Sequence, residues 1–140
     1  MTPEEWSKEQ LKPLSMFEIA KWWADGLKVA GAGNGAGFLT AGAALSTFQG
    51  HHRGLFEVKV AGLCFLIGVL AFAYAYALIY RAMHAQDEVS HATMRKDVAS
   101  INANSDLSGA SMNSANKYAL VSAVSFFVGC LIGLIAFLSY

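Results

Sequence analysis

The sequence predicts an all-α integral membrane protein with three transmembrane helices, an N-terminal amphipathic helix and a long second helix that extends into the cytoplasm. The 140-residue chain is 55% hydrophobic and only 14% charged, which is too apolar for an ordinary soluble domain. Three segments with few charges and no proline are long enough to cross about 30 Å of hydrocarbon, at about 1.5 Å per helical residue. Small residues recur along them at helical spacing, which is typical of helices that pack closely in a bilayer.

Residues 1–26 are expected to form amphipathic helices at the membrane surface. Pro3 favours a helix start, and Pro13 ends that first helix. In the helix that follows, Trp22 and Trp23 lie among charged residues, which suits a segment at the level of the lipid headgroups. This pattern indicates an aromatic anchor for the first span, with a partner-docking helix as the alternative.

The first transmembrane helix is expected over residues 27–48, and it contains the stretch GAGNGAGFLTAGAA. A dinucleotide-binding loop requires G-x-G-x-x-G after a strand, and a Walker loop requires a lysine after its last glycine; neither pattern is complete here. The glycines instead form small-xxx-small pairs that let helix backbones approach closely: Gly31, Gly33, Gly35 and Gly37. Asn34 would be costly facing lipid, so we expect protein to shield it, and we consider it a candidate polar or pore-lining residue.

The second transmembrane helix is expected over residues 55–80, continuing as a cytoplasmic helix to about residue 100, because no glycine or proline occurs between Gly68 and Gly109. One face of this helix, which we call the small-residue seam, follows a 3-4 spacing: Ala61, Cys64, Gly68, Ala71, Ala75, Leu78, Ala82, Ala85, Val89 and Ala92. The spacing indicates a long helix-packing surface. The alternative is that alanine and glycine are simply common in membrane helices.

Residues 101–116 are rich in asparagine, serine and glycine, so a polar connector is expected there. The third transmembrane helix is expected over residues 117–140. Its small residues lie on one stripe: Ser122, Ser125, Gly129, Gly133 and Ala136. Because Gly129 and Gly133 form a GxxxG pair, this stripe is also expected to pack against another helix.

The basic residues indicate an orientation in the membrane. Eight of the ten lysine and arginine residues precede the first span or lie between the second and third: Lys8, Lys12, Lys21, Lys28, Arg81, Arg95, Lys96 and Lys117. Arg53 and Lys59 lie near the hairpin between the first and second spans. Because cytoplasmic segments carry an excess of lysine and arginine, we expect a bacterial inner-membrane protein with its N-terminus in the cytoplasm and its C-terminus outside.

Few side chains are candidates for chemistry. One face of the long helix carries four ionisable groups: His84, Asp87, Glu88 and His91. The Glu-x-x-His spacing within it occurs in di-iron carboxylate bundles, but those need further carboxylates from facing helices. We therefore interpret this face as solvated or as a charge contact between helices, with a metal site as the less favoured alternative. Glu57 and Lys59 lie one turn into the second span and are candidates for the interface or for a selectivity ring.

These observations predict no enzyme, no cofactor and no nucleic-acid partner. The sequence contains no nucleophile and base pattern or phosphate loop, its net charge is zero, and Cys64 and Cys130 lie singly in apolar runs. The expected partners are the lipid bilayer and either further copies of this chain or a larger membrane complex. We expect self-assembly through the small-residue faces, which would allow a pore or channel. The alternative is a non-catalytic accessory subunit of a larger membrane complex.

Overall fold

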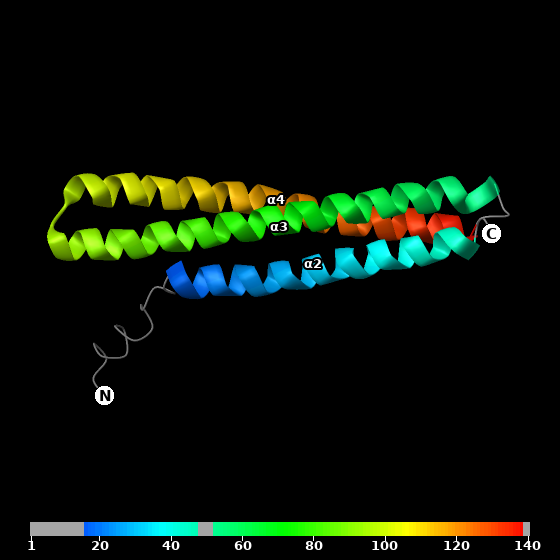
Figure 1. The fold of residues 1–140 in the computed structure, drawn as a ribbon, viewed down its shortest axis with the longest axis horizontal. Coiled ribbons are helices and arrows are strands. Elements are labelled where there is room, and N and C mark those ends of the chain that lie inside the picture. Colours follow the sequence, from blue (N-terminus) through cyan, green and yellow to red (C-terminus); the bar gives the residue numbers. More distant parts are fainter. Residues whose placement is uncertain (1–15, 48–51, 139–140) are drawn as a thin grey trace, which may run out of the picture.

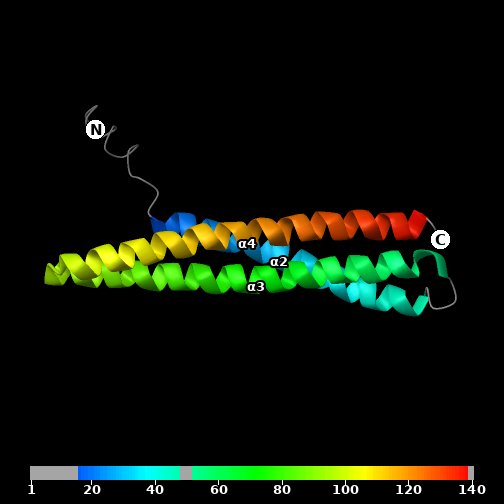
Figure 2. The ribbon, with the colours of Figure 1, turned by 90° about the horizontal axis from the view of Figure 1, so that it is seen from above.

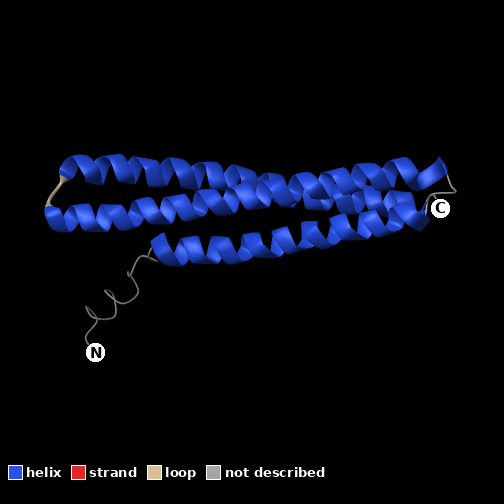
Figure 3. Cartoon of the chain, in the orientation of Figure 1, coloured by secondary structure: helices blue, strands red, loops and turns tan. Residues whose placement is uncertain are grey.

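The computed structural model describes residues 16–47 and 52–138, and these residues form three long α-helices. They are α2 (Met16–Thr47, 32 residues), α3 (His52–Arg95, 44 residues) and α4 (Val98–Leu138, 41 residues). Figure 1 shows the three helices side by side along the long axis, and Figure 3 shows the short loop between α3 and α4. The predicted all-helical fold is confirmed for the described residues. The helix expected before Pro13 lies outside them.

Helix α2 contains the whole glycine-rich stretch from Gly31 to Ala44, so a helix replaces the phosphate-binding loop that such glycines can also form. A glycine in a helix interior costs about 1 kcal/mol relative to alanine. Backbone propensity therefore does not explain this helix. Its stability depends on packing against the other two helices.

Helices α3 and α4 form an antiparallel hairpin and lie side by side along their lengths (Figures 1 and 2). Two serines of α4 donate hydrogen bonds to backbone carbonyl oxygens of α3. Ser122 Oγ donates to Gly68 O at 2.9 Å, and Ser108 Oγ donates to Ala82 O at 3.1 Å. The two bonds lie two heptads apart on both helices, so the pair keeps one register along this length.

The small-residue seam of α3 packs against α4. Its alanines are almost fully buried, from Ala61 at 2% exposure to Ala92 at 0%. The facing residues of α4 are also small and repeat every seven positions: Ser108, Ala115, Ser122, Gly129 and Ala136. Because Ser108 and Ser122 face the small residues Ala82 and Gly68 of α3, their hydroxyls reach carbonyl oxygens of that helix.

Lys96 and Asp97 form the turn between α3 and α4. Lys96 has a left-handed φ of 58°, and the amides of Lys96 and Asp97 donate to Thr93 O at 3.1 Å and Ala92 O at 3.0 Å. This is the Schellman arrangement that ends a helix. Asp97 then caps α4, because its carboxylate accepts hydrogen bonds from the amide and the hydroxyl of Ser100 at 3.2 Å and 2.6 Å.

The polar connector expected over residues 101–116 does not form, because these residues are helical and belong to α4. Ser108, Ser111 and Ala115 are buried, so small polar residues serve here as packing residues instead of loop residues. Helix α3 correspondingly ends at Arg95 and does not continue to about residue 100.

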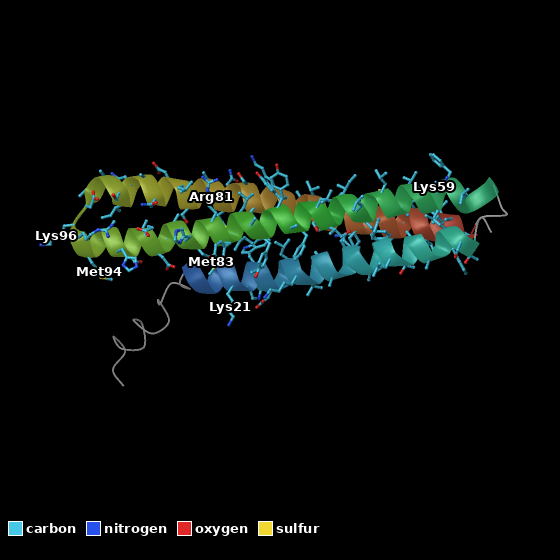
Figure 4. The ribbon with its side chains drawn as sticks, viewed as in Figure 1. Lys21, Lys59, Arg81, Met83, Met94 and Lys96 are labelled. Carbon is cyan, nitrogen blue, oxygen red and sulfur yellow. The ribbon has the colours of Figure 1, made fainter. Side chains whose placement is uncertain are left out.

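Helix α2 packs more extensively on α3 than on α4. Two buried clusters hold the three helices together. One contains Leu27, Ala75, Ile79 and Ala115, and the other contains Ala41, Val58 and Ala136. Beyond the N-terminal end of α2, the hairpin continues as α3 and α4 alone (Figure 1), with Met83 near this boundary (Figure 4). We call the part of the hairpin beyond α2, residues 83–107, the stalk.

Two of the described helices are apolar enough to cross a membrane. They are α3, from Gly54, and α4, and only 28% and 17% of their most apolar segments are buried in the molecule. Exposed side chains there include Leu63, at 61%, and Phe127, at 70%. The core helix of a soluble protein would be mostly buried, so this exposed apolar surface is compatible with membrane insertion. Among the described helices, α2 does not reach the same apolar character.

Candidate functional site

A buried polar centre joins the three helices, and it consists of Asn34 on α2, Gly68 on α3 and Ser122 on α4. Asn34 and Ser122 are both 0% exposed. Asn34 Nδ2 donates to Ala30 O at 3.0 Å in its own helix, and to Ser122 O at 3.0 Å and Ser122 Oγ at 3.1 Å on α4. Ser122 Oγ donates in turn to Gly68 O. One amide and one hydroxyl therefore link all three helices.

The orientation of the Asn34 amide follows from these partners. Backbone carbonyl oxygens of Ala30 and Ser122 face one side of the amide, and only its NH₂ group can donate to them. The other side, Asn34 Oδ1, is buried without a hydrogen-bond partner, and the amide lies directly against Gly68. An unpaired buried acceptor costs about 1–3 kcal/mol. The hydrogen bonds of Nδ2 and of Ser122 offset that cost.

Three of the glycines on α2 accept aromatic rings from the neighbouring helices. A Cβ atom added at these positions would lie too close to the rings: at Gly31 it would be 2.6 Å from Phe72, at Gly37 2.5 Å from Phe65, and at Gly33 3.0 Å from Phe126. The rings of α3 and α4 therefore occupy the space that the missing side chains leave. This is the close approach that small-xxx-small pairs allow.

The GxxxG pair of α4 is divided between two environments. A Cβ added at Gly129 would lie 2.9 Å from the Phe65 ring, so Gly129 packs inside the molecule. A Cβ added at Gly133, or at Gly35 of α2, would meet nothing within 4 Å. Gly35 and Gly133 therefore leave free space that no part of the described fold fills.

The remaining residues predicted for packing or for a pore lie in different places. Of the predicted packing residues, Ala61, Ala71 and Ala75 are buried, and Ser125 is half-buried. Glu57 is half-buried and Lys59 is exposed, near the end of the bundle opposite the stalk (Figure 4). No ion pair among the described residues involves either of them. Asn34 is enclosed by helices and does not face any open channel in the single chain.

The four ionisable residues on the stalk part of α3 lie largely at the surface. His84, Asp87 and His91 are exposed, and Glu88 is half-buried. Within residues 16–47 and 52–138, no group of three or more histidine, cysteine or acidic side chains is arranged to hold a metal ion. Three of the four side chains are therefore accessible at the surface of the stalk.

Two apolar grooves lie between α2 and α4, one on each side of the polar centre. The stalk-side groove, of about 560 Å³, is lined by Trp22, Trp23, Asp25, Gly26, Leu27, Val29, Ala30, Asn116, Ala119, Leu120 and Ala123. The far-side groove, of about 370 Å³, is lined by Gly37, Thr40, Ala41, Ala44, Val58, Ala61, Phe65, Gly129, Cys130, Gly133, Ala136 and Phe137. Helix α2 packs mainly on α3, which leaves these grooves open on its α4 side.

The stalk-side groove carries an ion pair at its edge. Asp25 lines the groove, and its Oδ1 accepts a hydrogen bond from Lys28 Nζ at 2.9 Å. This hydrogen bond and the positive charge of Lys28 hold the pKa of Asp25 below its usual value. The carboxylate of Asp25 is therefore ionised at neutral pH. It remains accessible, since both side chains are more than half exposed.

Several residues that build this arrangement escaped prediction from the sequence. The aromatic rings that fill the glycine positions repeat at seven-residue spacing on α3, as Phe65 and Phe72, followed by Ile79. Ser108 lies one heptad repeat from Ala115 on α4. A search for seven-residue spacing would have found both repeats, provided that it covered the serine-rich part of α4 as well as the apolar parts. Asp97, which caps α4, is a common N-cap residue type.

No protein-family model matches this chain, and no curated protein or solved structure matches it. The function is therefore inferred from the residues and the geometry alone. Among the described residues, the most specific features are the polar centre, the two grooves and the stalk.

Proposed function

We propose that this chain is a non-catalytic, membrane-embedded subunit whose stalk contacts another protein of a membrane complex on the cytoplasmic side. The observation that carries the proposal is the continuous pairing of α3 and α4 beyond the apolar part of the molecule. From Arg81 to Arg95 the hairpin extends by roughly 20 Å, at about 1.5 Å per residue. A membrane anchor does not need this extension, so we assign it to contact with a partner.

The surface of the apolar part supports its placement in lipid. Between Leu63 and Ala73, every exposed side chain of α3 is apolar. The same holds for α4 from Leu120 to Leu138, if cysteine is counted as apolar. The polar groups of the polar centre are buried and mostly paired, as the hydrocarbon core of a bilayer requires. We include α2 as a third span, because it shares that centre.

The distribution of basic residues supports a cytoplasmic stalk. Lys21, Arg81 and Lys96 lie in the half of the molecule that carries the stalk, and Lys59 lies near the opposite end (Figure 4). The positive-inside rule then favours a cytoplasmic stalk, with the end of α4 outside. An inner membrane of a bacterium fits this distribution.

Self-assembly is the second candidate. The small-residue seam does not support it, because the seam is used for packing within one chain and is not free to join copies. The open glycines of α2 and α4 do favour it. Gly133 lines the far-side groove, and nothing lies within 4 Å of a Cβ added there or at Gly35, so a further helix could approach at these positions. A pore receives less support, because the exposed surfaces of the described apolar segments carry no continuous polar stripe.

Site-specific photo-crosslinking in native membranes tests the choice between these candidates. A photoreactive residue at the exposed Asn102 on the stalk is expected to capture one protein of discrete mass, whereas the same residue at the lipid-facing Leu131 is not. The chain purified alone is expected to be monomeric, and the Gly133→Leu variant is expected to be monomeric too. Crosslinks between copies only, together with an oligomer that Gly133→Leu disrupts, would instead establish self-assembly.

A further inference from the structure

We propose that the stalk-side groove binds one phospholipid whose zwitterionic headgroup contains an ammonium group, with an acyl chain between α2 and α4. This inference rests on the proposed membrane placement and adds a specific ligand to it. Three observations support it: the direction in which the groove changes from polar to apolar, the ion pair at its edge, and the tryptophans beside that pair.

The groove changes from polar to apolar in one direction on both of its walls. Helices α2 and α4 both run away from the stalk, so their residues occur in the same order along the groove (Figure 1). On α2 the lining passes from Trp22, Trp23 and Asp25 to Ala30, and on α4 it passes from Asn116 to Ala123. The polar end therefore faces the stalk side, where the proposed membrane boundary lies. A lipid with its headgroup at that boundary has the same polarity gradient.

The ion pair of Asp25 and Lys28 is complementary to a zwitterionic headgroup. Lys28 Nζ is bonded to Asp25 Oδ1 at 2.9 Å, so a negative and a positive group lie side by side. A headgroup that holds a phosphate next to an ammonium can match this pair, with its phosphate near Lys28 and its ammonium near Asp25. An anionic headgroup without an ammonium would place only negative charge near the Asp25 carboxylate. The groove should therefore favour phosphatidylethanolamine over phosphatidylglycerol.

Two tryptophans lie at the same end of the groove. Trp22 is 77% exposed and Trp23 is 42% exposed, and both line the groove. Indole rings are enriched at the headgroup level, where the N–H can donate to phosphate and the ring face attracts ammonium groups. The rings therefore supply both kinds of contact that the proposed headgroup needs.

Native mass spectrometry of the full chain tests this inference. The chain would be purified, incubated with an equal mixture of phosphatidylethanolamine and phosphatidylglycerol, and examined for retained lipid. We expect one phosphatidylethanolamine per chain, retained roughly three-fold in preference to phosphatidylglycerol. Asp25→Asn should remove the preference for phosphatidylethanolamine.

Two further variants test the position of the lipid. Ala123→Phe, which adds a ring inside the groove, should remove the bound lipid. Asp87→Asn, on the exposed face of the stalk, is the matched control and should change neither result.

Equal or greater retention of phosphatidylglycerol would overturn the inference, as would an unchanged preference in Asp25→Asn. A dimer that Ala123→Phe dissociates would also overturn it, because a second copy would then occupy the groove. Alkaline carbonate extraction separates this failure from failure of the proposed function. A chain that resists extraction but shows no lipid preference contradicts only the lipid site, whereas a chain that carbonate releases contradicts the membrane placement itself.

Discussion

At the scale of single residues, the polar centre defines the position of α2. Alanines and glycines make contacts that change little when one helix slides along another, whereas the hydrogen bonds of Asn34 to Ser122 form at one register. Interhelical hydrogen bonds in membranes contribute only about 0.6 kcal/mol on average. We therefore infer that Asn34 contributes more to the choice of register than to total stability.

Gly68→Ala tests the contact at the polar centre. A Cβ at this position would lie 2.6 Å from Asn34 Nδ2 and closer to the other amide atoms. The amide is enclosed and hydrogen-bonded, so it cannot move aside easily. Overpacking of this kind costs about 1–3 kcal/mol. We expect Gly68→Ala to lower the free energy of unfolding in detergent, measured by titration with dodecyl sulfate.

A second change and a matched control make this prediction specific. Asn34→Ala removes the amide that the new Cβ would meet, so the double variant should regain part of the stability that Gly68→Ala loses. Gly35→Ala should cost little, because nothing lies within 4 Å of a Cβ added there. A double variant no more stable than Gly68→Ala would show that another contact causes the loss.

The cap of α4 predicts a pH dependence at the tip of the stalk. Hydrogen bonds from the hydroxyl and the amide of Ser100 hold the pKa of Asp97 below its usual value of 3.8. The ionised cap therefore stabilises the tip above pH 3.8, and this contribution is lost as the pH falls through the lowered pKa. A spin label at the exposed Ala99 should become more mobile over that range. Asp97→Asn, which can also cap a helix, should remove most of the pH dependence.

At the scale of elements, helices were predicted well from the sequence where small residues recur at helical spacing. The small-residue seam of α3 and the glycine-rich α2 were predicted as helices, because their spacing excludes the loops that glycines can form. The first half of α4 was missed. Its asparagines and serines are loop residues by propensity, but Ser108 and Ser111 are buried against α3. Tertiary packing decided the structure there, and local composition did not reveal it.

The paired stalk predicts that its seam cannot accept a larger side chain. Ala92 is 0% exposed near the tip, so Ala92→Leu should separate α3 from α4 there. Hydrogen exchange should rise over residues 85–105 and remain unchanged over residues 60–75. The exposed Ala103, changed to leucine, is the control and should have little effect. Unchanged exchange in Ala92→Leu would contradict the continuous pairing of the stalk.

At the scale of the whole molecule, the sequence indicated which residues pack but not which helix each of them meets. Gly129 and Gly133 belong to one motif, yet only Gly129 contacts another helix of the described chain. Asn34 was expected to need shielding, and the structure identifies Ser122 and Gly68 as the residues that provide it. Such pairings depend on the order and tilt of the helices. Spacing along a single helix does not contain that information.

The central claim is that the bundle lies in a membrane with its stalk in water on the cytoplasmic side. Cysteine accessibility tests this claim most directly. Cys130 is exposed in the fold but would face lipid, and Ser105 is exposed on the stalk. We expect a membrane-impermeant maleimide to modify Ser105→Cys in inside-out vesicles and not in intact cells. Cys130 should react only after detergent is added. Modification of Cys130 in intact membranes, or of Ser105→Cys from the outside, would contradict the proposed placement.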